Sequence, residues 1–204
     1  MIVIIDYKMG NLASIKNMLH RIGYNDVVIS SDYKDVENAD KLILPGVGSF
    51  DQGVRNLREY DLDSAIKYSV GEQGKPLMGI CLGMQLLGAQ SEEGTLQGLN
   101  LIPFDTVRFD LDKEYKVPHM GWDEVVIKKK GEKITEGLYE SSQRYYFVHS
   151  YHAVCQNNED VIMTCSYGYE FVAAVSRDNI CGFQFHPEKS HRYGMRLLEN
   201  FTKV

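Results

Sequence analysis

The amino-acid sequence predicts an α/β protein with a doubly wound, mixed and mostly parallel sheet that is flanked by helices. Over the first ~100 residues, short apolar runs alternate with helix-period segments, which is the pattern of βαβ units. These runs are continuously apolar, as expected of strands that are covered on both faces. From about Leu101 the strand-like stretches alternate apolar and polar residues, which predicts antiparallel additions in the C-terminal half.

The first half begins with a predicted strand at residues 2–5, followed by a helix whose apolar side chains recur at helical spacing from Leu12 to Ile22. Asn11 is suited to begin this helix as its N-cap, and Gly23 is suited to end it. Further strands are predicted at residues 27–29, 42–44 and 77–80. In such a sheet the groups that follow the carboxyl ends of the strands meet at one edge, where ligands bind.

The second half contains six stretches that predict strands, at residues 106–109, 124–127, 145–148, 161–163, 171–175 and 180–185. A closing helix is predicted from about Ser190 to Phe201, with Leu197, Leu198 and Phe201 on its packing face. No linker rich in Pro, Gly or Ser separates the halves. Residues 1–204 are therefore expected to form a single domain.

The composition excludes several classes of protein. With 44% hydrophobic and 25% charged residues, the chain is neither disordered nor fibrous. Its net charge of −6 argues against a nucleic-acid-binding surface, which needs clustered Lys and Arg. No apolar stretch approaches the ~20 residues that span a bilayer, and no leader precedes the first strand. We therefore expect a cytoplasmic protein without a membrane partner.

Cysteines and histidines give no sign of a metal site. The four cysteines lack CxxC spacing, so neither a zinc knuckle nor a thioredoxin motif is expected. His149 and His152 have no carboxylate or cysteine at ligand spacing, and we expect no metal and no cofactor. Three of the cysteines lie in apolar runs and are expected to pack in the core: Cys155, Cys165 and Cys181.

Cys81 differs from the other cysteines because it follows an apolar strand and has Gly79 and Gly83 two residues away on either side. This G-x-C-x-G pattern is a cysteine version of the nucleophile elbow, in which a strained turn leaves no room for larger neighbours. The N–H groups at the start of a helix after such a turn favour a thiolate and can face an oxyanion. The alternative is a buried cysteine that only packs against a tight strand–helix turn.

A cysteine nucleophile needs a base close in space, and His186 is the best-placed histidine, because it ends the predicted strand at residues 180–185. The carboxylate of Glu188 can fold back on the imidazole and fix its tautomer. The alternatives are a histidine with a structural role at the end of a strand and an acid that stabilises the start of a helix. We interpret Cys81, His186 and Glu188 as a catalytic triad.

A second loop, with the sequence Pro-Gly-Val-Gly at residues 45–48, follows the predicted strand at residues 42–44. Its glycines free backbone N–H groups to point at an anion or an oxyanion. A phosphate-binding loop is the rival interpretation, although no Walker Lys-Ser/Thr follows. A tight turn without a function is a further alternative interpretation.

The motifs at residues 45–48, 79–85 (GICLGMQ) and 186–188 (HPE) together resemble the class-I, triad-type glutamine amidotransferases. The stretches at residues 6–11, 117–122 and 146–151 make the chain similar, within that class, to the glutaminase subunits of imidazole glycerol phosphate synthase. The resemblance covers essentially the whole chain. It implies the amidotransferase fold and the hydrolysis of glutamine to glutamate and ammonia. The ammonia would pass through a tunnel to a (β/α)8-barrel cyclase subunit of histidine biosynthesis.

The resemblance also implies roles for individual residues. Cys81 would form a γ-glutamyl thioester, His186 would protonate the departing ammonia and then activate water, and Glu188 would orient His186. The oxyanion would be bound by backbone N–H groups of Gly46, Val47, Gly48 and Leu82. Glutamine would be held by Gln85, Ser150 and Tyr151. The cyclase or the ammonia passage would be contacted by Asn11, Ser49, Phe50, His119, Trp122 and Lys189.

Two positions depart from the family's pattern. Lys8 stands where a small residue is common, and Asp123 stands where Asn is usual. Because the resemblance assigns both regions to the side that faces the partner, a paralogue that supplies ammonia for amidation of a surface-sugar precursor is an alternative. A non-catalytic regulatory module of the same fold is another, against which the intact triad argues. A cysteine peptidase or deglycase is a third, and Gln85 favours glutamine over it.

Overall fold

A computed structural model describes residues 1–129, 131–138 and 142–204. Its helices are α1 (Leu12–Arg21), α2 (Tyr33–Asn38), α3 (Phe50–Glu59), α4 (Leu62–Lys67), α5 (Leu82–Gln85) and α6 (His191–Lys203). Its strands are β1 (Ile2–Ile5), β2 (Val27–Ser30), β3 (Lys41–Leu44), β4 (Leu77–Ile80), β5 (Gln90–Ser91), β6 (Phe104–Arg108), β7 (His119–Ile127), β8 (Gln143–His149), β9 (Tyr151–Cys155), β10 (Val161–Tyr167), β11 (Tyr169–Arg177) and β12 (Ile180–Phe183). A π-helical turn covers Tyr68–Glu72, and short 3-10 turns cover Lys133–Thr135, Asn158–Asp160 and Pro187–Lys189.

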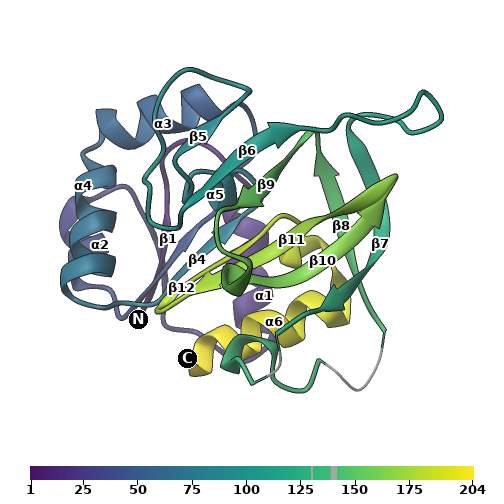
Figure 1. Ribbon diagram of the computed structural model, residues 1–204. Coiled ribbons are helices and arrows are strands. Elements are labelled where there is room, and N and C mark those ends of the chain that lie inside the picture. Colours follow the sequence, from purple (N-terminus) through teal and green to yellow (C-terminus); the bar gives the residue numbers. More distant parts are fainter. Residues whose placement is uncertain (130, 139–141) are drawn as a thin grey trace.

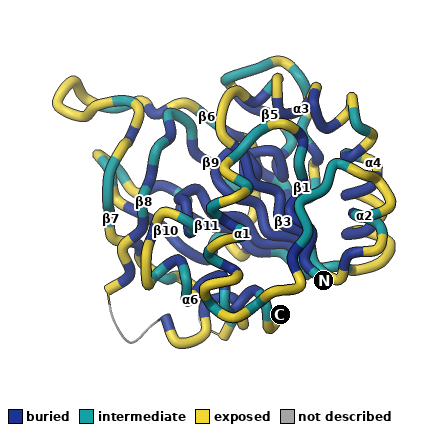
Figure 2. The backbone as a smooth tube through the Cα atoms, turned by 180° about the vertical axis from the view of Figure 1, so that it is seen from behind, coloured by how far each residue is buried: buried dark blue, intermediate teal, exposed yellow. Residues whose placement is uncertain are grey.

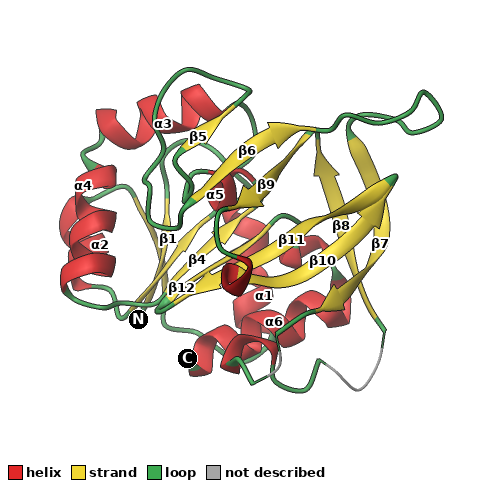
Figure 3. Cartoon of the chain, viewed as in Figure 1, coloured by secondary structure: helices red, strands yellow, loops and turns green. Residues whose placement is uncertain are grey.

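One mixed sheet runs through both halves of the chain, in the order β2-β1-β3-β4-β12-β11-β10-β7-β8, and β9 joins β6 and β5 to it through β11 (Figure 3). Strands β2, β1, β3, β4 and β12 are parallel, and the strands from β11 onward are antiparallel. Strand β12 connects the two parts, because it pairs parallel with β4 and antiparallel with β11. The predicted mixed sheet with antiparallel additions is confirmed.

Helices cover both faces of the parallel part (Figure 1). Ile2 and Ile4 of β1 pack on the face that α1 and α6 cover. Val3 and Ile5, which point the other way, pack on the face that α2, α3 and α4 cover. Strand β1 is buried along its length and β3 from Leu42 to Leu44, and both appear mostly dark when coloured by burial (Figure 2).

Most of the predicted elements are present at the predicted places. The first helix ends at Arg21, and Gly23 takes the left-handed conformation (φ +88°) that stops it. The closing helix is α6, with its three predicted packing residues buried. Strand β9 is missing from the sequence prediction because its burial does not alternate cleanly along the strand. Helices α2 and α4 have only six residues each, too short for a helical period to be recognised.

Candidate active site

The carboxyl ends of β3, β4 and β12 lie side by side, because these three strands are parallel neighbours. Strand β3 leads into the Pro-Gly-Val-Gly segment at residues 45–48, β4 leads into Cys81, and β12 leads through Gln184 to His186. Cys81 and His186, which are about 100 residues apart in the sequence, therefore meet at one edge of the sheet, as predicted for a doubly wound protein.

Cys81 lies in a strained turn between β4 and α5. Its backbone has φ +54° and ψ −110°, a region that residues with a side chain rarely occupy. Its N–H donates to the carbonyl oxygen of Phe183 at 2.8 Å, which holds the turn against β12. A Cβ at Gly83 would overlap the carbonyl oxygen of Leu44, and one at Gly79 would lie 2.8 Å from the carbonyl oxygen of Gly83. The strained turn expected of a nucleophile elbow is thus present, with glycine required on both sides.

His186 and Glu188 form a buried pair beside this turn. Nδ1 of His186 lies 2.8 Å from Oε1 of Glu188, and both side chains are only 2% exposed. The 3-10 turn at Pro187–Lys189 folds the carboxylate back onto the ring, as the sequence predicted. Ser190 fixes the turn, because its hydroxyl donates to the carbonyl oxygen of His186 at 2.6 Å.

The surroundings of His186 favour its charged form. Burial lowers the pKa of His186, but interactions with the side chains of Cys81 and Glu188 outweigh burial and raise it to about 10. The carboxylate of Glu188 is hydrogen-bonded to Nδ1 of His186, whereas Nε2 of the same ring is buried without a hydrogen-bond partner among the described residues. Nε2 is therefore the ring nitrogen available to the thiol of Cys81. A thiol and an imidazole in this arrangement can form a thiolate–imidazolium pair.

A pocket of about 370 Å³ opens in front of Cys81. This volume lies within the range of sites that hold small molecules. Seven residues that the sequence analysis singled out line it together: Val47, Gly48, Cys81, Leu82, Gln85, Ser150 and Tyr151. Four further lining residues were not predicted: Glu93, Pro118, Val148 and His149. Glu93 is the anionic group of this wall, and it also accepts a hydrogen bond from the N–H of Phe50 at 2.8 Å, at the start of α3.

The Pro-Gly-Val-Gly segment runs directly against the start of α5. Tyr7, which follows β1, donates from its hydroxyl to the carbonyl oxygen of Pro45 at 2.5 Å. A Cβ at Gly46 would overlap this hydroxyl and would lie 2.8 Å from the N atom of Gly83. Gly48 takes φ +113°, and Val47 between these glycines is 41% exposed at the rim of the pocket. The segment is therefore packed at Gly46 and open at Val47.

An amide network connects the thiol with the far wall of the pocket. Nε2 of Gln85 donates to the carbonyl oxygen of Tyr151 at 3.2 Å and to Oε1 of Gln184 at 3.1 Å. Nε2 of Gln184 in turn donates to Sγ of Cys81 at 3.8 Å. Both bonds of Gln85 use its NH2 group, so its carbonyl oxygen has a fixed orientation. Sequence reasoning missed Gln184: its place between two phenylalanines marks it as a polar residue in an apolar run, but does not show that it contacts the thiol.

The residues expected to face a partner do not share one environment. Asn11, Ser49 and Lys189 are exposed, and Trp122 is half-buried. The side chains of Phe50 and His119 are 0% and 1% exposed. Phe50 packs in the core, and His119 stacks on the rings of Tyr167 and Phe147. The expected place of these residues at the partner or at the ammonia passage stays a prediction.

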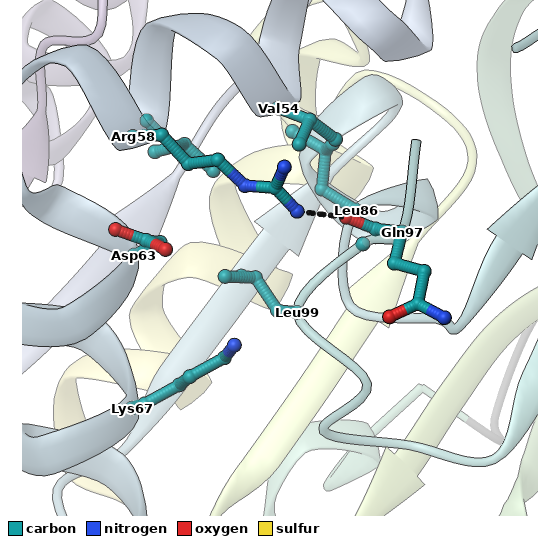
Figure 4. A pocket seen from close by; sticks show the side chains of 9 residues that line it. Val54, Arg58, Asp63, Lys67, Leu86, Gln97 and Leu99 are labelled. Atoms are coloured by element: carbon teal, nitrogen blue, oxygen red, sulfur yellow. Dashed lines mark hydrogen bonds between the residues drawn. The ribbon is translucent and has the colours of Figure 1, made fainter. Parts of the chain in front are cut away.

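A second pocket lies between α3, α4 and the segment at residues 97–99 (Figure 4). Arg58 closes it by donating to the carbonyl oxygen of Gln97 at 3.1 Å. Its volume is about 10 Å³, which is room for about one water molecule. It does not qualify as a substrate site.

Within residues 1–129, 131–138 and 142–204, no group of three or more His, Cys, Asp or Glu side chains is arranged to hold a metal ion. The helices of the same ranges include none that is both long and apolar enough to cross a bilayer. All four cysteines are free. Cys165 and Cys181 are buried, as expected of core residues, and Cys155 is partly buried.

Comparison with known families gives a match over nearly the whole chain. The family model described as glutamine amidotransferase class-I matches residues 3–204. The chain belongs to the class-I glutamine amidotransferase family. The geometry described above therefore lies in an amidotransferase, and the resemblance of its motifs to that family is confirmed.

Relatives of this amidotransferase share about half of its residues over the full length. A protein of Methanococcus maripaludis named imidazole glycerol phosphate synthase subunit HisH 2 is 52% identical, over 100% of this chain and 99% of that protein. A Pseudomonas aeruginosa protein of the same name is 50% identical over 100% of both chains. A protein of Aquifex aeolicus named imidazole glycerol phosphate synthase subunit HisH is 45% identical, over 98% of this chain and 95% of that protein.

Solved structures agree on the fold of the amidotransferase. The structure of PurLQS from Thermotoga maritima matches with a TM-score of 0.76 at 19% identity, over 99% of this chain and 97% of that chain. A crystal structure of a glutamine amidotransferase matches with a TM-score of 0.75 at 19% identity, over 98% of this chain and 97% of that chain. At these identities the similarity supports the fold alone.

Proposed function

We propose that the chain is the glutaminase subunit of an imidazole glycerol phosphate synthase. It hydrolyses glutamine to glutamate and ammonia and passes the ammonia to a (β/α)8-barrel cyclase subunit in histidine biosynthesis. The observation that carries the glutaminase activity is the strained Cys81 at a 370 Å³ pocket, beside the buried His186–Glu188 pair. Support for the acceptor comes from relatives of matching length that are named as subunits of this synthase.

Glutamine enters the pocket with its side-chain amide toward Cys81. The fixed carbonyl oxygen of Gln85 accepts from the substrate, and Ser150 and Tyr151 form the wall beside it. The carboxylate of Glu93 attracts the α-ammonium group. These groups align the γ-carbonyl carbon with the sulfur, which supplies most of the entropic advantage of the reaction.

The thiolate of Cys81 attacks the γ-carbonyl carbon while His186 holds the proton as an imidazolium. The oxyanion that forms is bound by backbone N–H groups of the segment at residues 46–48 and of Leu82. Of these residues, Val47, Gly48 and Leu82 line the pocket. When the C–N bond breaks, Nε2 of His186 gives its proton to the nitrogen, and ammonia leaves. The γ-glutamyl group is then a thioester of Cys81.

Water completes the cycle. His186, now neutral, takes a proton from a water molecule, which attacks the thioester carbon, and the C–S bond breaks to release glutamate and the thiolate. Glu188 keeps Nδ1 protonated at each step and stabilises the imidazolium. The proposal includes a reducing, cytoplasmic compartment, because the mechanism needs a free thiol and all four cysteines are free.

A second acceptor is favoured by one specific observation. Lys8 takes φ +66°, a conformation that favours glycine, and Asp6 secures it by accepting from both its N–H at 2.9 Å and its Nζ at 3.1 Å. Lys8 is thus a half-exposed cation on the side of the chain that the resemblance assigns to the partner, where a small residue is common. The second candidate is therefore a paralogue that supplies ammonia for amidation of a surface-sugar precursor.

The test combines purified components with genetics. The chain, together with the cyclase subunit of the same organism, is given glutamine and the phosphorylated ribulosyl intermediate. We expect imidazole glycerol phosphate to form, low glutaminase activity from the chain alone, and no activity from Cys81→Ser with or without the cyclase. Deletion of the gene is expected to make cells require histidine. Growth without histidine, in a strain with no second copy, decides against the histidine pathway, and loss of a nitrogen-containing surface sugar then supports the other acceptor. Full activity of Cys81→Ser overturns the glutaminase mechanism.

A further inference from the structure

Three short contacts connect a surface carboxylate with the wall of the pocket. Oδ2 of Asp123 lies 2.6 Å from Nε2 of His119, and Nδ1 of His119 lies 3.2 Å from Nε2 of His149. Nδ1 of His149 lies 2.7 Å from the carbonyl oxygen of Tyr151. The same oxygen accepts the hydrogen bond from Gln85, and His149 and Tyr151 both line the pocket.

The number of hydrogens needed by this row of contacts exceeds what two neutral histidines carry. The row ends on two acceptors, the carboxylate of Asp123 and the carbonyl oxygen of Tyr151. Each of the three contacts between them needs one hydrogen, but each neutral imidazole has a single N–H. All three contacts are hydrogen bonds only when the row holds one additional proton. That proton belongs on a histidine, because an ordinary imidazole binds a proton more tightly than an ordinary carboxylate does.

We propose that Asp123, His119 and His149 form a proton-binding relay that positions the Ser150–Tyr151 wall of the pocket, and that binding of the additional proton strengthens the binding of glutamine. The three are positioning residues, since they act through the wall and not on the reacting atoms. The part of this inference that concerns glutamine rests on the proposed function. The part that concerns the proton does not.

The additional proton belongs to the His119 end of the relay. Burial lowers the pKa of His149 to about 3, so that this ring stays neutral with its N–H toward Tyr151. Burial also lowers the pKa of His119, while Asp123 raises it in part, so that the proton binds on the acid side of the ordinary histidine range. Asp123 is 40% exposed and gives the relay its access to solvent.

Other titratable groups face the relay from the neighbouring elements. Tyr167 of β10 stacks on His119 with 4.1 Å between ring centroids, and Cys165 of the same strand lies near Asp123. His152 of β9 and His186 after β12 act on His149, and each disfavours a charge there. These neighbours add no acceptor to the row, so the proton count is unchanged.

Loss of the proton breaks the middle contact. His119 then keeps its remaining hydrogen on Nε2, because the charge-assisted bond to Asp123 is the strongest of the three. Nδ1 of His119 and Nε2 of His149 face each other with lone pairs at 3.2 Å, and the rings repel. Because His149 holds the carbonyl oxygen of Tyr151, the repulsion displaces the wall that positions Gln85 and the substrate.

The first test measures the proton itself, in the full chain labelled with 15N in histidine. Between about pH 8 and about pH 5.5, Nδ1 of His119 is expected to change from the unprotonated to the protonated signal. In Asp123→Asn the NH2 group can donate to Nε2 of His119, so the relay is complete with two ring hydrogens and no proton uptake is expected. A wild-type Nδ1 that does not titrate, or a variant that titrates like the wild type, overturns the relay.

The second test measures its effect on glutamine, using the chain with its cyclase subunit. The KM of the wild type for glutamine is expected to fall about fivefold between about pH 8 and about pH 5.5, which is the value of one ordinary hydrogen bond. The KM of Asp123→Asn should stay low across this range, with the kcat profile unchanged. Glu124→Gln removes a charge at the next, exposed position of β7 and should behave like the wild type.

Two outcomes of this second test are decisive. Equal KM profiles for wild type and Asp123→Asn overturn the coupling to Tyr151. Absence of glutaminase activity in all variants contradicts the proposed function, and the first test then decides on the relay.

Discussion

The side-chain amide of Gln184 donates to Sγ of Cys81 at 3.8 Å and accepts from Gln85 at 3.1 Å. A single buried amide thus contacts both the thiol and the residue that we assign to the substrate's amide. The position of the nucleophile and that of the substrate are set by one side chain.

We expect Gln184→Glu to reduce kcat by about 10- to 100-fold, because a carboxylate would face the thiolate instead of an NH2 group. The same change should slow the alkylation of Cys81 by iodoacetamide, because the amide donor to the sulfur is lost. Gln73→Glu, at an exposed position before the start of β4, adds the same charge at the end of that strand opposite Cys81 and serves as the control. An unchanged alkylation rate for Gln184→Glu would show that the amide does not act on the thiol.

Strain at Cys81 can be measured by comparing two variants that both lack the thiol. We expect Cys81→Gly to be more stable than Cys81→Ala by about 1 kcal/mol, because φ +54° disfavours any side chain. At an ordinary position alanine is the more stable of the two. The free energies of unfolding in denaturant provide the measurement, and a more stable alanine variant would refute the strain.

Gly46→Ala is expected to cost about 1–3 kcal/mol of stability and most of the glutaminase activity. The added Cβ would overlap the hydroxyl of Tyr7 and press on the N atom of Gly83, and both sites are too tightly packed to yield. Gly71→Ala is the matched control, because a Cβ there meets no atom within 4 Å. Similar unfolding midpoints for the two variants would contradict the packing argument.

Buried His186, whose pKa is raised by Cys81 and Glu188, predicts a stability that falls in alkali. The folded-state pKa of His186 is about 10, against an ordinary value of 6.5. The unfolded chain therefore loses this proton first as pH rises, and the stabilisation, complete below about pH 6.5, is lost progressively up to about pH 10. Glu188→Gln should flatten this slope and lower kcat. Denaturant unfolding across this pH range is the measurement, and parallel slopes for the two proteins would rule out the assignment.

The sequence predicts a site residue well where its chemistry also requires a particular backbone geometry, because that geometry restricts the neighbouring residues. Cys81 was found from two glycines, because a strained turn restricts its neighbours along the chain. Gln184 was missed, since nothing local distinguishes a glutamine that contacts sulfur from one that only fills a strand. His119 was expected at a surface next to Trp122, but Tyr167, which lies 48 residues later in the chain, covers its ring. Contacts of this kind depend on strand order, which local patterns do not contain.

Strand β12, which pairs with β4 on one side and β11 on the other, also determines when the chain becomes reactive. Cys81 leaves the ribosome about 100 residues before His186, and until Ile180–Phe183 is in place β4 has a free edge and the thiol has no base. A nascent or truncated chain therefore carries an inert cysteine. Glutamine can be cleaved only after the last strand has joined the two halves, which protects the cell from wasteful hydrolysis by unfinished protein.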